Sequence, residues 1–153
     1  MTQVMKWFYL VDMAVWLGSL VFFSFVVAPT VHRTLKTEDA AALIRRIFPK
    51  YYFVGMVCAG VGIVLVGLLV ADQAFAKWPG ALSLLLLAAL GATNAGLWFF
   101  LLPQMNKLRE RKQLSAEAEA DWKTLHRLSV QLNVAVLVGV LALLFLVVFA
   151  RVA

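Results

Sequence analysis

The sequence contains four apolar runs, each long enough to cross a lipid bilayer as a helix. They cover about residues 7–31, 51–71, 80–102 and 128–150, and the last three contain no charged side chain. Crossing roughly 30 Å of hydrocarbon takes about 20 apolar residues. A backbone in lipid can hydrogen-bond only to other backbone, so runs of this length favour helices. The sequence therefore predicts an all-α membrane protein, a single four-transmembrane-helix bundle over residues 1–153.

Composition supports this class and excludes others. Hydrophobic residues make up 63% of the chain and charged residues 14%, whereas a soluble domain carries roughly a quarter charged residues. The single cysteine, Cys58, excludes an internal disulfide framework and a multi-cysteine metal site. A net charge of +6 could indicate nucleic-acid binding. Its distribution along the chain indicates membrane topology instead, and no nucleic-acid partner is expected.

The Lys and Arg residues are unevenly distributed between the two sides that four alternating spans define. Of 14, three lie on the side of both termini, namely Lys6, Lys77 and Arg151. The other eleven, from Arg33 to Arg127, lie in segments 32–50 and 103–127. Cytoplasmic loops carry the excess of positive charge. We therefore predict a plasma membrane protein of the bacterial inner-membrane type, with these segments cytoplasmic and both termini outside.

The two basic segments also show helical patterns. Leu43, Ile44, Ile47 and Phe48 recur at helical spacing, which predicts a short amphipathic helix on the inner leaflet between spans 1 and 2, ended by Pro49. Ser115 can cap a helix, and the fourth span is expected to begin there, in the cytoplasm, and to run unbroken.

Small residues recur four apart in every span, a spacing that lets helices approach closely. The pairs are Ala14/Gly18, Gly55/Ala59, Ala92/Gly96 and Ala135/Gly139. The pattern predicts a tightly packed bundle and is uninformative about activity.

Several polar residues lie within the spans, toward the basic side. Ser24, Asn94, Ser129 and Asn133 come from three different spans, and His32, Arg33, His126 and Arg127 rim the same side. A buried polar group without a partner costs roughly 2–7 kcal/mol, so we expect these side chains to meet, with the two asparagines bonding across the bundle. Two interpretations stay open: hydrogen bonds that only join helices, or an inward-facing polar pocket that receives a solute, an ion or a cofactor head group.

Asp12 is an acidic residue inside the first span, near the opposite side of the membrane. Such a residue is costly in lipid unless it reaches the interface, a partner or an aqueous cavity. It either extends to the outer interface near Lys6 or serves as an outer station for a cation or proton.

Signals for catalysis and metal binding are weak. His32 and His126 could converge, but the methionines lack a sulfur-rich spacing suited to copper(I). A haem needs an axial ligand within the spans, and neither histidine lies deep. The chain also lacks a recognisable nucleophile–base pair, phosphate-binding glycine loop or pair of catalytic carboxylates, so we expect no catalysis of its own.

A set of short motifs resembles the small membrane proteins of the transmembrane protein 205 type, a domain of unknown function. They are Ser24-Phe25-Val26 with Arg33, Ile47-Phe48-Pro49 followed by Tyr51-Tyr52, Thr93-Asn94-Ala95, Pro103, and His126-Arg127-Leu128-Ser129 with Asn133. The resemblance covers nearly the whole chain and implies a four-helix membrane bundle. It also implies a distant similarity to copper-resistance D membrane proteins and to a haem-linked protoporphyrinogen oxidase family, and so to metal or cofactor handling. Some relatives carry a histidine near the start of the first span, where this chain has Phe8 and Tyr9.

The function expected from the sequence is binding or passage of a small solute or metal cation through the inward-facing polar pocket. A haem- or quinone-dependent oxidoreductase is the first alternative, and a structural subunit of a larger membrane complex is the second. The cofactor stays unknown, with haem or a metal ion possible. The bilayer is the expected partner, and the chain could assemble with copies of itself.

Overall fold

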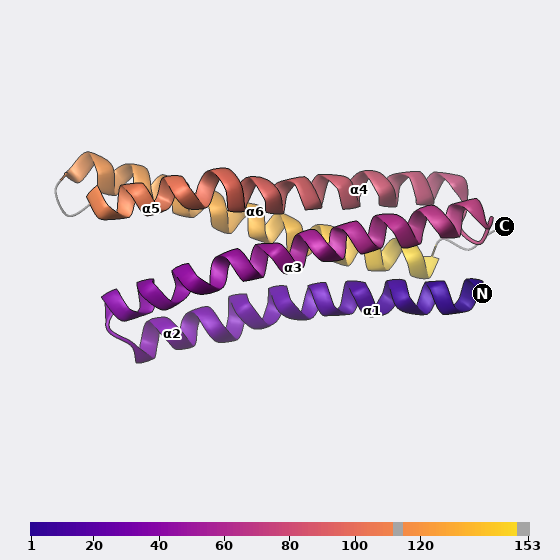
Figure 1. The fold of residues 1–153 in the computed structure, drawn as a ribbon, viewed down its shortest axis with the longest axis horizontal. Coiled ribbons are helices and arrows are strands. Elements are labelled where there is room, and N and C mark those ends of the chain that lie inside the picture. The colour runs from indigo at the N-terminus through magenta and orange to yellow at the C-terminus, as the bar shows by residue number, and fades with distance from the viewer. Residues whose placement is uncertain (112–114, 150–153) are drawn as a thin grey trace.

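The computed structural model describes residues 1–111 and 115–149 and consists of four long helical segments that lie side by side (Figure 1). The first comprises α1 (Thr2–Val21), the π-helical segment η1 (Phe22–Val27) and α2 (Ala28–Thr34). The second is α3 (Thr37–Ala71), and the third comprises α4 (Lys77–Gly96), the π-helical η2 (Leu97–Leu101) and α5 (Leu102–Arg111). The fourth is α6 (Ala116–Phe149). Lys112, Leu114, Ala150 and Arg151, which contributed to the sequence predictions, lie outside the described residues.

All four segments are long and apolar enough to span a membrane, as predicted. They contain 33 to 35 residues each, or about 50 Å of helix at 1.5 Å per residue. This exceeds the roughly 30 Å hydrocarbon core. Each helical segment also extends beyond the apolar run that predicted it.

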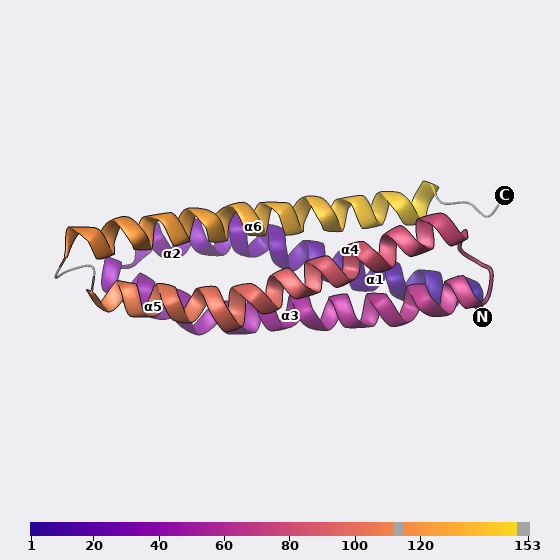
Figure 2. The same cartoon turned by 90° about the horizontal axis from the view of Figure 1, so that it is seen from above.

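The segments alternate in direction (Figures 1 and 2). The hydroxyl of Thr2 donates to Asp72 Oδ2 at 2.6 Å, so the N-terminus lies beside the turn after α3. The end of α2, the start of α3, α5 and the start of α6 lie at the opposite end, called the basic end below because most described Lys and Arg residues belong to these segments. Within the bundle, α3 packs against α1 and α4, and α6 packs against α1, α4 and α5.

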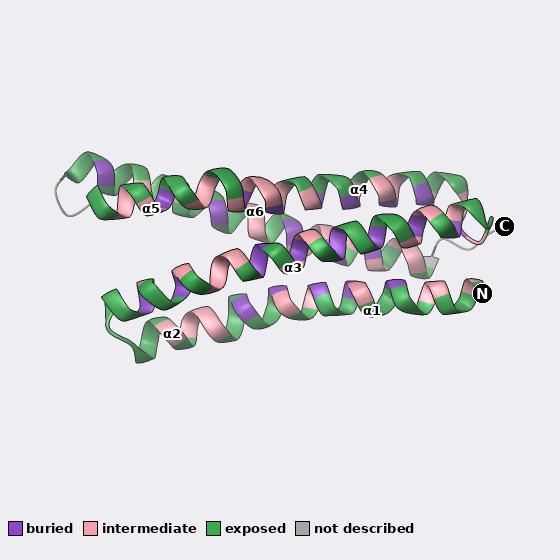
Figure 3. Cartoon of the chain, in the orientation of Figure 1, coloured by how far each residue is buried: buried purple, intermediate pink, exposed green. Residues whose placement is uncertain are grey.

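The buried residues form a narrow stripe along each helix (Figure 3). On α1 the stripe is Tyr9, Met13, Trp16 and Leu20, at spacings of three and four residues. Large apolar side chains elsewhere are exposed, among them Phe25, Leu85, Phe100 and Phe145. Exposed apolar surface of this extent is typical of a protein whose outer faces contact lipid.

Close packing through small residues is confined to part of the predicted pattern. A Cβ on Gly62 would lie 2.8 Å from Leu87, and one on Gly91 would lie 3.0 Å from Ala59, so α3 and α4 approach closely. Nothing lies within 4 Å of such an atom at Gly18 or Gly96. Of the glycines in the predicted pairs, Gly55 and Gly139 are closely packed, because an added Cβ would lie 2.6 Å from Asn94 and 2.7 Å from Leu90, whereas Gly18 and Gly96 are not.

Both π-helical segments come just before a proline. The N–H of Ala28 donates to Phe23 O and that of Leu102 to Leu97 O, each five residues back. A proline ring clashes with the carbonyl four residues earlier and supplies no N–H. A wider turn before Pro29 and Pro103 accommodates the ring, and such π turns are frequent at functional sites.

The prediction that Pro49 ends a separate amphipathic helix is wrong. Residues 37–48 form the first turns of α3, which continues through Pro49 to Ala71. Proline costs a membrane helix less than a soluble one because neighbouring groups can satisfy the freed carbonyl. The prediction for α6 is confirmed: the helix starts at Ala116, and Ser115 accepts a 3.5 Å hydrogen bond from the N–H of Ala118.

Candidate functional site

A hydrogen bond between two helices marks the centre of the predicted polar layer. The hydroxyl of Tyr51 on α3 donates to Asn133 Oδ1 on α6 at 3.0 Å, and Asn133 Nδ2 donates to the Ser129 carbonyl at 2.8 Å. The hydroxyl of Tyr52 also lies within hydrogen-bonding reach of the Asn133 side chain. Both tyrosines are buried. Asn133 therefore bonds across the bundle to Tyr51, beside Tyr52.

Ser24 brings the first helical segment into the same layer. It lies in η1, and its hydroxyl is within hydrogen-bonding reach of the Tyr51 side chain, although the residue as a whole is exposed. Ser129 is buried, one turn before Asn133, and its hydroxyl donates to the His126 carbonyl at 2.8 Å. Ser24, Ser129 and Asn133 thus gather around the paired tyrosines.

Asn94 lies about one helical turn deeper in the bundle and contacts a different part of α3. It is 2% exposed, and its Nδ2 donates to the Leu90 carbonyl at 2.9 Å. Its Oδ1 faces Gly55, where an added Cβ would lie only 2.6 Å away. Only a glycine leaves room for the amide here.

The expected bond between the two asparagines does not occur among the described residues. Each amide instead donates to the carbonyl four residues earlier on its own helix, as Thr93 also does to Ala89 at 2.8 Å. The tyrosines take the bridging position. The sequence analysis did not predict this bridging role for Tyr51 and Tyr52, although their place at the start of an apolar run, near Gly55, was an available signal.

A cavity of about 20 Å³ adjoins this layer on the side of the basic end. Its polar lining consists of Arg45, Tyr52, Asn106, Arg109 and Ser129, and its floor includes the buried side chains of Leu97 and Met105. A cavity needs roughly 10–15 Å³ to hold one water molecule. The space therefore fits one water-sized group, with polar side chains on part of its wall and apolar side chains on the rest.

Two arginines from different helices line the cavity. Arg109 of α5 donates from Nη1 to the Ala41 carbonyl at 3.4 Å, and its Cζ lies 5.4 Å from the ring centre of Trp122. Arg45 of α3 lies close enough to Arg109 for their charges to repel. Within residues 1–111 and 115–149, no carboxylate lies within 4.0 Å of either guanidinium. Positive charge without a countercharge therefore gathers beside the cavity.

The predicted rim residues lie at the basic end. His32, Arg33, His126 and Arg127 are all exposed there. The ring of His126 stacks on Trp122 with centroids 5.0 Å apart, and His32 is near enough to affect it electrostatically. In the described part of the chain, no group of three or more His, Cys, Asp or Glu residues is placed to hold a metal ion.

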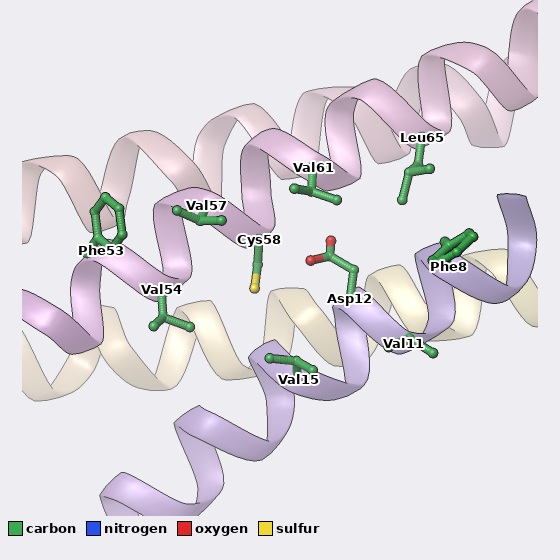
Figure 4. Close-up of a pocket in the computed structure, with 10 residues that line it drawn as sticks. All are labelled: Phe8, Val11, Asp12, Val15, Phe53, Val54, Val57, Cys58, Val61 and Leu65. Carbon is green, nitrogen blue, oxygen red and sulfur yellow. The ribbon is translucent and has the colours of Figure 1, made fainter.

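Asp12 lies apart from the polar layer. It lines a groove of about 490 Å³ between α1 and α3, within hydrogen-bonding reach of the Cys58 thiol (Figure 4). Asp12 is separated from Ser24 by twelve positions, or about 18 Å of helix. The sequence offered two interpretations of Asp12, extension to the outer interface near Lys6 or an outer station for a cation or proton, and did not predict Cys58 as its neighbour.

Comparison with known proteins identifies relatives without a known activity. Residues 11–114 match the profile of a family described as Domain of unknown function (DUF4149). An uncharacterized protein of Aquifex aeolicus (strain VF5) is 31% identical over 135 residues, which are 88% of this chain and 89% of that protein. No solved structure matches the chain.

Proposed function

We propose that this chain, which belongs to the DUF4149 family, is an integral membrane protein that binds a small anionic solute in a pocket at its basic end. One observation carries the proposal: a cavity beside an interhelical hydrogen bond is lined by two arginines that no described carboxylate neutralises. The neighbouring hydroxyls and amide of Tyr52, Ser129 and Asn106 can complete the shell around a bound oxygen.

The lining favours an anion over the metal cation considered from the sequence. Two guanidiniums repel a cation, and they bind carboxylate or phosphate oxygens through charge-assisted, often bidentate hydrogen bonds. The more exposed arginines stand at the outer part of the cavity, while Tyr52 and Ser129 are buried. One oxygen of the anion occupies the cavity and the rest of it lies between the guanidiniums.

The similarity to the transmembrane protein 205 type and to copper-resistance D proteins remains a prediction. If it holds, three of the residues that resemble those families, Ser24, Ser129 and Asn133, belong to the layer beside the cavity, and Asn94 lies about one turn deeper. Metal handling would then need donors beyond these hydroxyls and amides, which are poor ligands for copper.

Binding to the protein in phosphatidylcholine nanodiscs tests whether the solute is an anion or a metal cation. Calorimetric titration with inorganic phosphate is expected to give saturable binding at one site per chain, whereas zinc chloride is expected to give none. Saturable zinc binding without phosphate binding would reverse the assignment.

We also place the basic end in the cytoplasm and both termini outside, in a bacterial inner membrane. The described Lys and Arg residues are concentrated in α2, in α5 and near the starts of α3 and α6. This distribution supports the orientation. The lipid-facing apolar surfaces fit a bilayer as the principal partner, and assembly with further copies stays a prediction.

Thiol labelling in intact cells tests the orientation. In a Cys58→Ser background, Lys77→Cys is expected to react with a membrane-impermeant maleimide, whereas Lys36→Cys should react only after lysis. Both lysines are exposed and lie at opposite ends of the bundle. The reverse labelling pattern would show that the basic end faces outward.

A further inference from the structure

The groove between α1 and α3 is separate from the anion pocket and has a different chemistry. It runs from Phe8 to Val15 on α1 and from Phe53 to Leu65 on α3 (Figure 4). These stretches correspond to about 10 and 18 Å of helix. The volume of about 490 Å³ falls within the usual range for small-molecule sites, about 300–1,000 Å³.

The groove walls are apolar apart from one pair of side chains. Valines, phenylalanines and a leucine supply eight of its ten lining residues, and Asp12 and Cys58 supply the other two. Figure 4 shows the Asp12 carboxylate directed from α1 toward α3, between Cys58 and Val61. Among the residues that the structure describes, no Lys, Arg or His lines the groove.

The Asp12 carboxylate is incompletely satisfied. Its Oδ2 is shielded from solvent and makes no hydrogen bond, while the Cys58 thiol is the side chain within hydrogen-bonding reach. Cys58 is a weak donor and cannot supply positive charge. An acidic group at this depth in a membrane helix normally pairs with a partner or faces a functional cavity. Among the described residues no Lys, Arg or His pairs with Asp12, and a cationic ligand would balance its charge.

We infer that this groove binds a lipophilic amine from the membrane, a molecule with one protonated nitrogen between two apolar arms. The nitrogen donates to the Asp12 carboxylate, which lines the groove, and balances its charge. The arms lie along the groove on either side of Asp12, against Phe8 and Leu65 in one direction and Phe53 and Val54 in the other. Charge complementarity distinguishes this ligand from an ordinary acyl chain, which would fill the same space and leave the carboxylate oxygen without a partner.

Three probes of similar shape separate charge from apolar filling without any substitution in the protein. Dioctylamine carries the protonated N–H, dioctyldimethylammonium carries the charge without the donor, and dioctyl ether carries neither. Native mass spectrometry of the detergent-solubilised protein should show 1:1 binding, with the amine at least tenfold tighter than the ether and the quaternary ion in between. Equal affinities for the amine and the ether would overturn the proposal and indicate a groove for apolar chains only.

Two substitutions locate the binding. Asp12→Asn should weaken dioctylamine at least tenfold while leaving dioctyl ether unchanged. Val57→Trp should weaken both probes by filling the groove, and because Val57 is 45% exposed, the larger side chain displaces little of the packed core. If Val57→Trp leaves amine binding unchanged, the amine binds elsewhere and the groove assignment fails.

Discussion

Replacing Gly55 by alanine is expected to destabilise the folded protein by about 1–3 kcal/mol, the usual cost of forcing an extra methyl group into a packed core. The new Cβ would lie 2.6 Å from Oδ1 and 2.8 Å from Cγ of Asn94, closer than atoms in contact can approach. Asn94 is almost fully buried and tied to the Leu90 carbonyl. To move away, the amide would have to stretch or lose that hydrogen bond, so the clash is not relieved cheaply.

Gly60→Ala provides the matched control on the same helix. Nothing lies within 4 Å of a Cβ added at Gly60, and alanine in place of glycine lowers the entropy of the unfolded chain. Thermal unfolding in one detergent should therefore show a lower midpoint for Gly55→Ala and an unchanged or higher midpoint for Gly60→Ala. Equal midpoints for the two variants would mean that the α3–α4 contact is looser than described.

Removing the two guanidiniums of the pocket is expected to have the largest effect on solute binding. Hydrogen bonds to charged groups contribute about 1.5–3 kcal/mol each, so either Arg45→Gln or Arg109→Gln should weaken phosphate at least tenfold. The double variant should weaken it about a hundredfold or more. Arg109 also packs against Trp122, so Arg45→Gln, which leaves that contact in place, is the cleaner single variant.

Arg46→Gln is the control for this experiment. Arg46 neighbours Arg45 on α3 but is exposed and does not line the cavity. Its loss removes one positive charge from the basic end, so it reports the contribution of general electrostatic attraction, which salt screens. If Arg46→Gln weakens phosphate as much as Arg45→Gln, binding is a diffuse surface effect and the pocket is not its site.

The crossings could be predicted from the sequence because a bilayer imposes a length and a composition on every helix that spans it. The gathering of Ser24, Ser129 and Asn133 followed from the alternation of helix direction, which fixes depth. The same pattern does not determine how each helix is rotated about its own axis, and so it does not determine which side chains face each other. For this reason the partner of Asn133 proved to be Tyr51, and Asn94 proved to face Gly55 instead of the other asparagine.

Local backbone features were also beyond the sequence pattern. The three prolines within the helical segments are similar signals in the sequence. π turns precede Pro29 and Pro103, whereas α3 continues as an α-helix through Pro49. Tertiary contacts determine which response occurs. The Asp12–Cys58 pair was missed for a related reason, because it joins residues 46 positions apart whose approach depends on how α1 and α3 face each other.

The central claim is that polar side chains from separate helices meet in one layer beside the pocket, and a double-mutant cycle on Tyr51 and Asn133 tests it most directly. Tyr51→Phe, Asn133→Leu and the double variant remove the 3.0 Å bond. Unfolding free energies should show a coupling of about 0.6–1.7 kcal/mol, the range for such bonds in membrane proteins. The control pairs Tyr51→Phe with Ser83→Ala, a buried serine near the other end of the bundle, and should be additive within about 0.5 kcal/mol. Additivity of the Tyr51 and Asn133 substitutions would contradict the account.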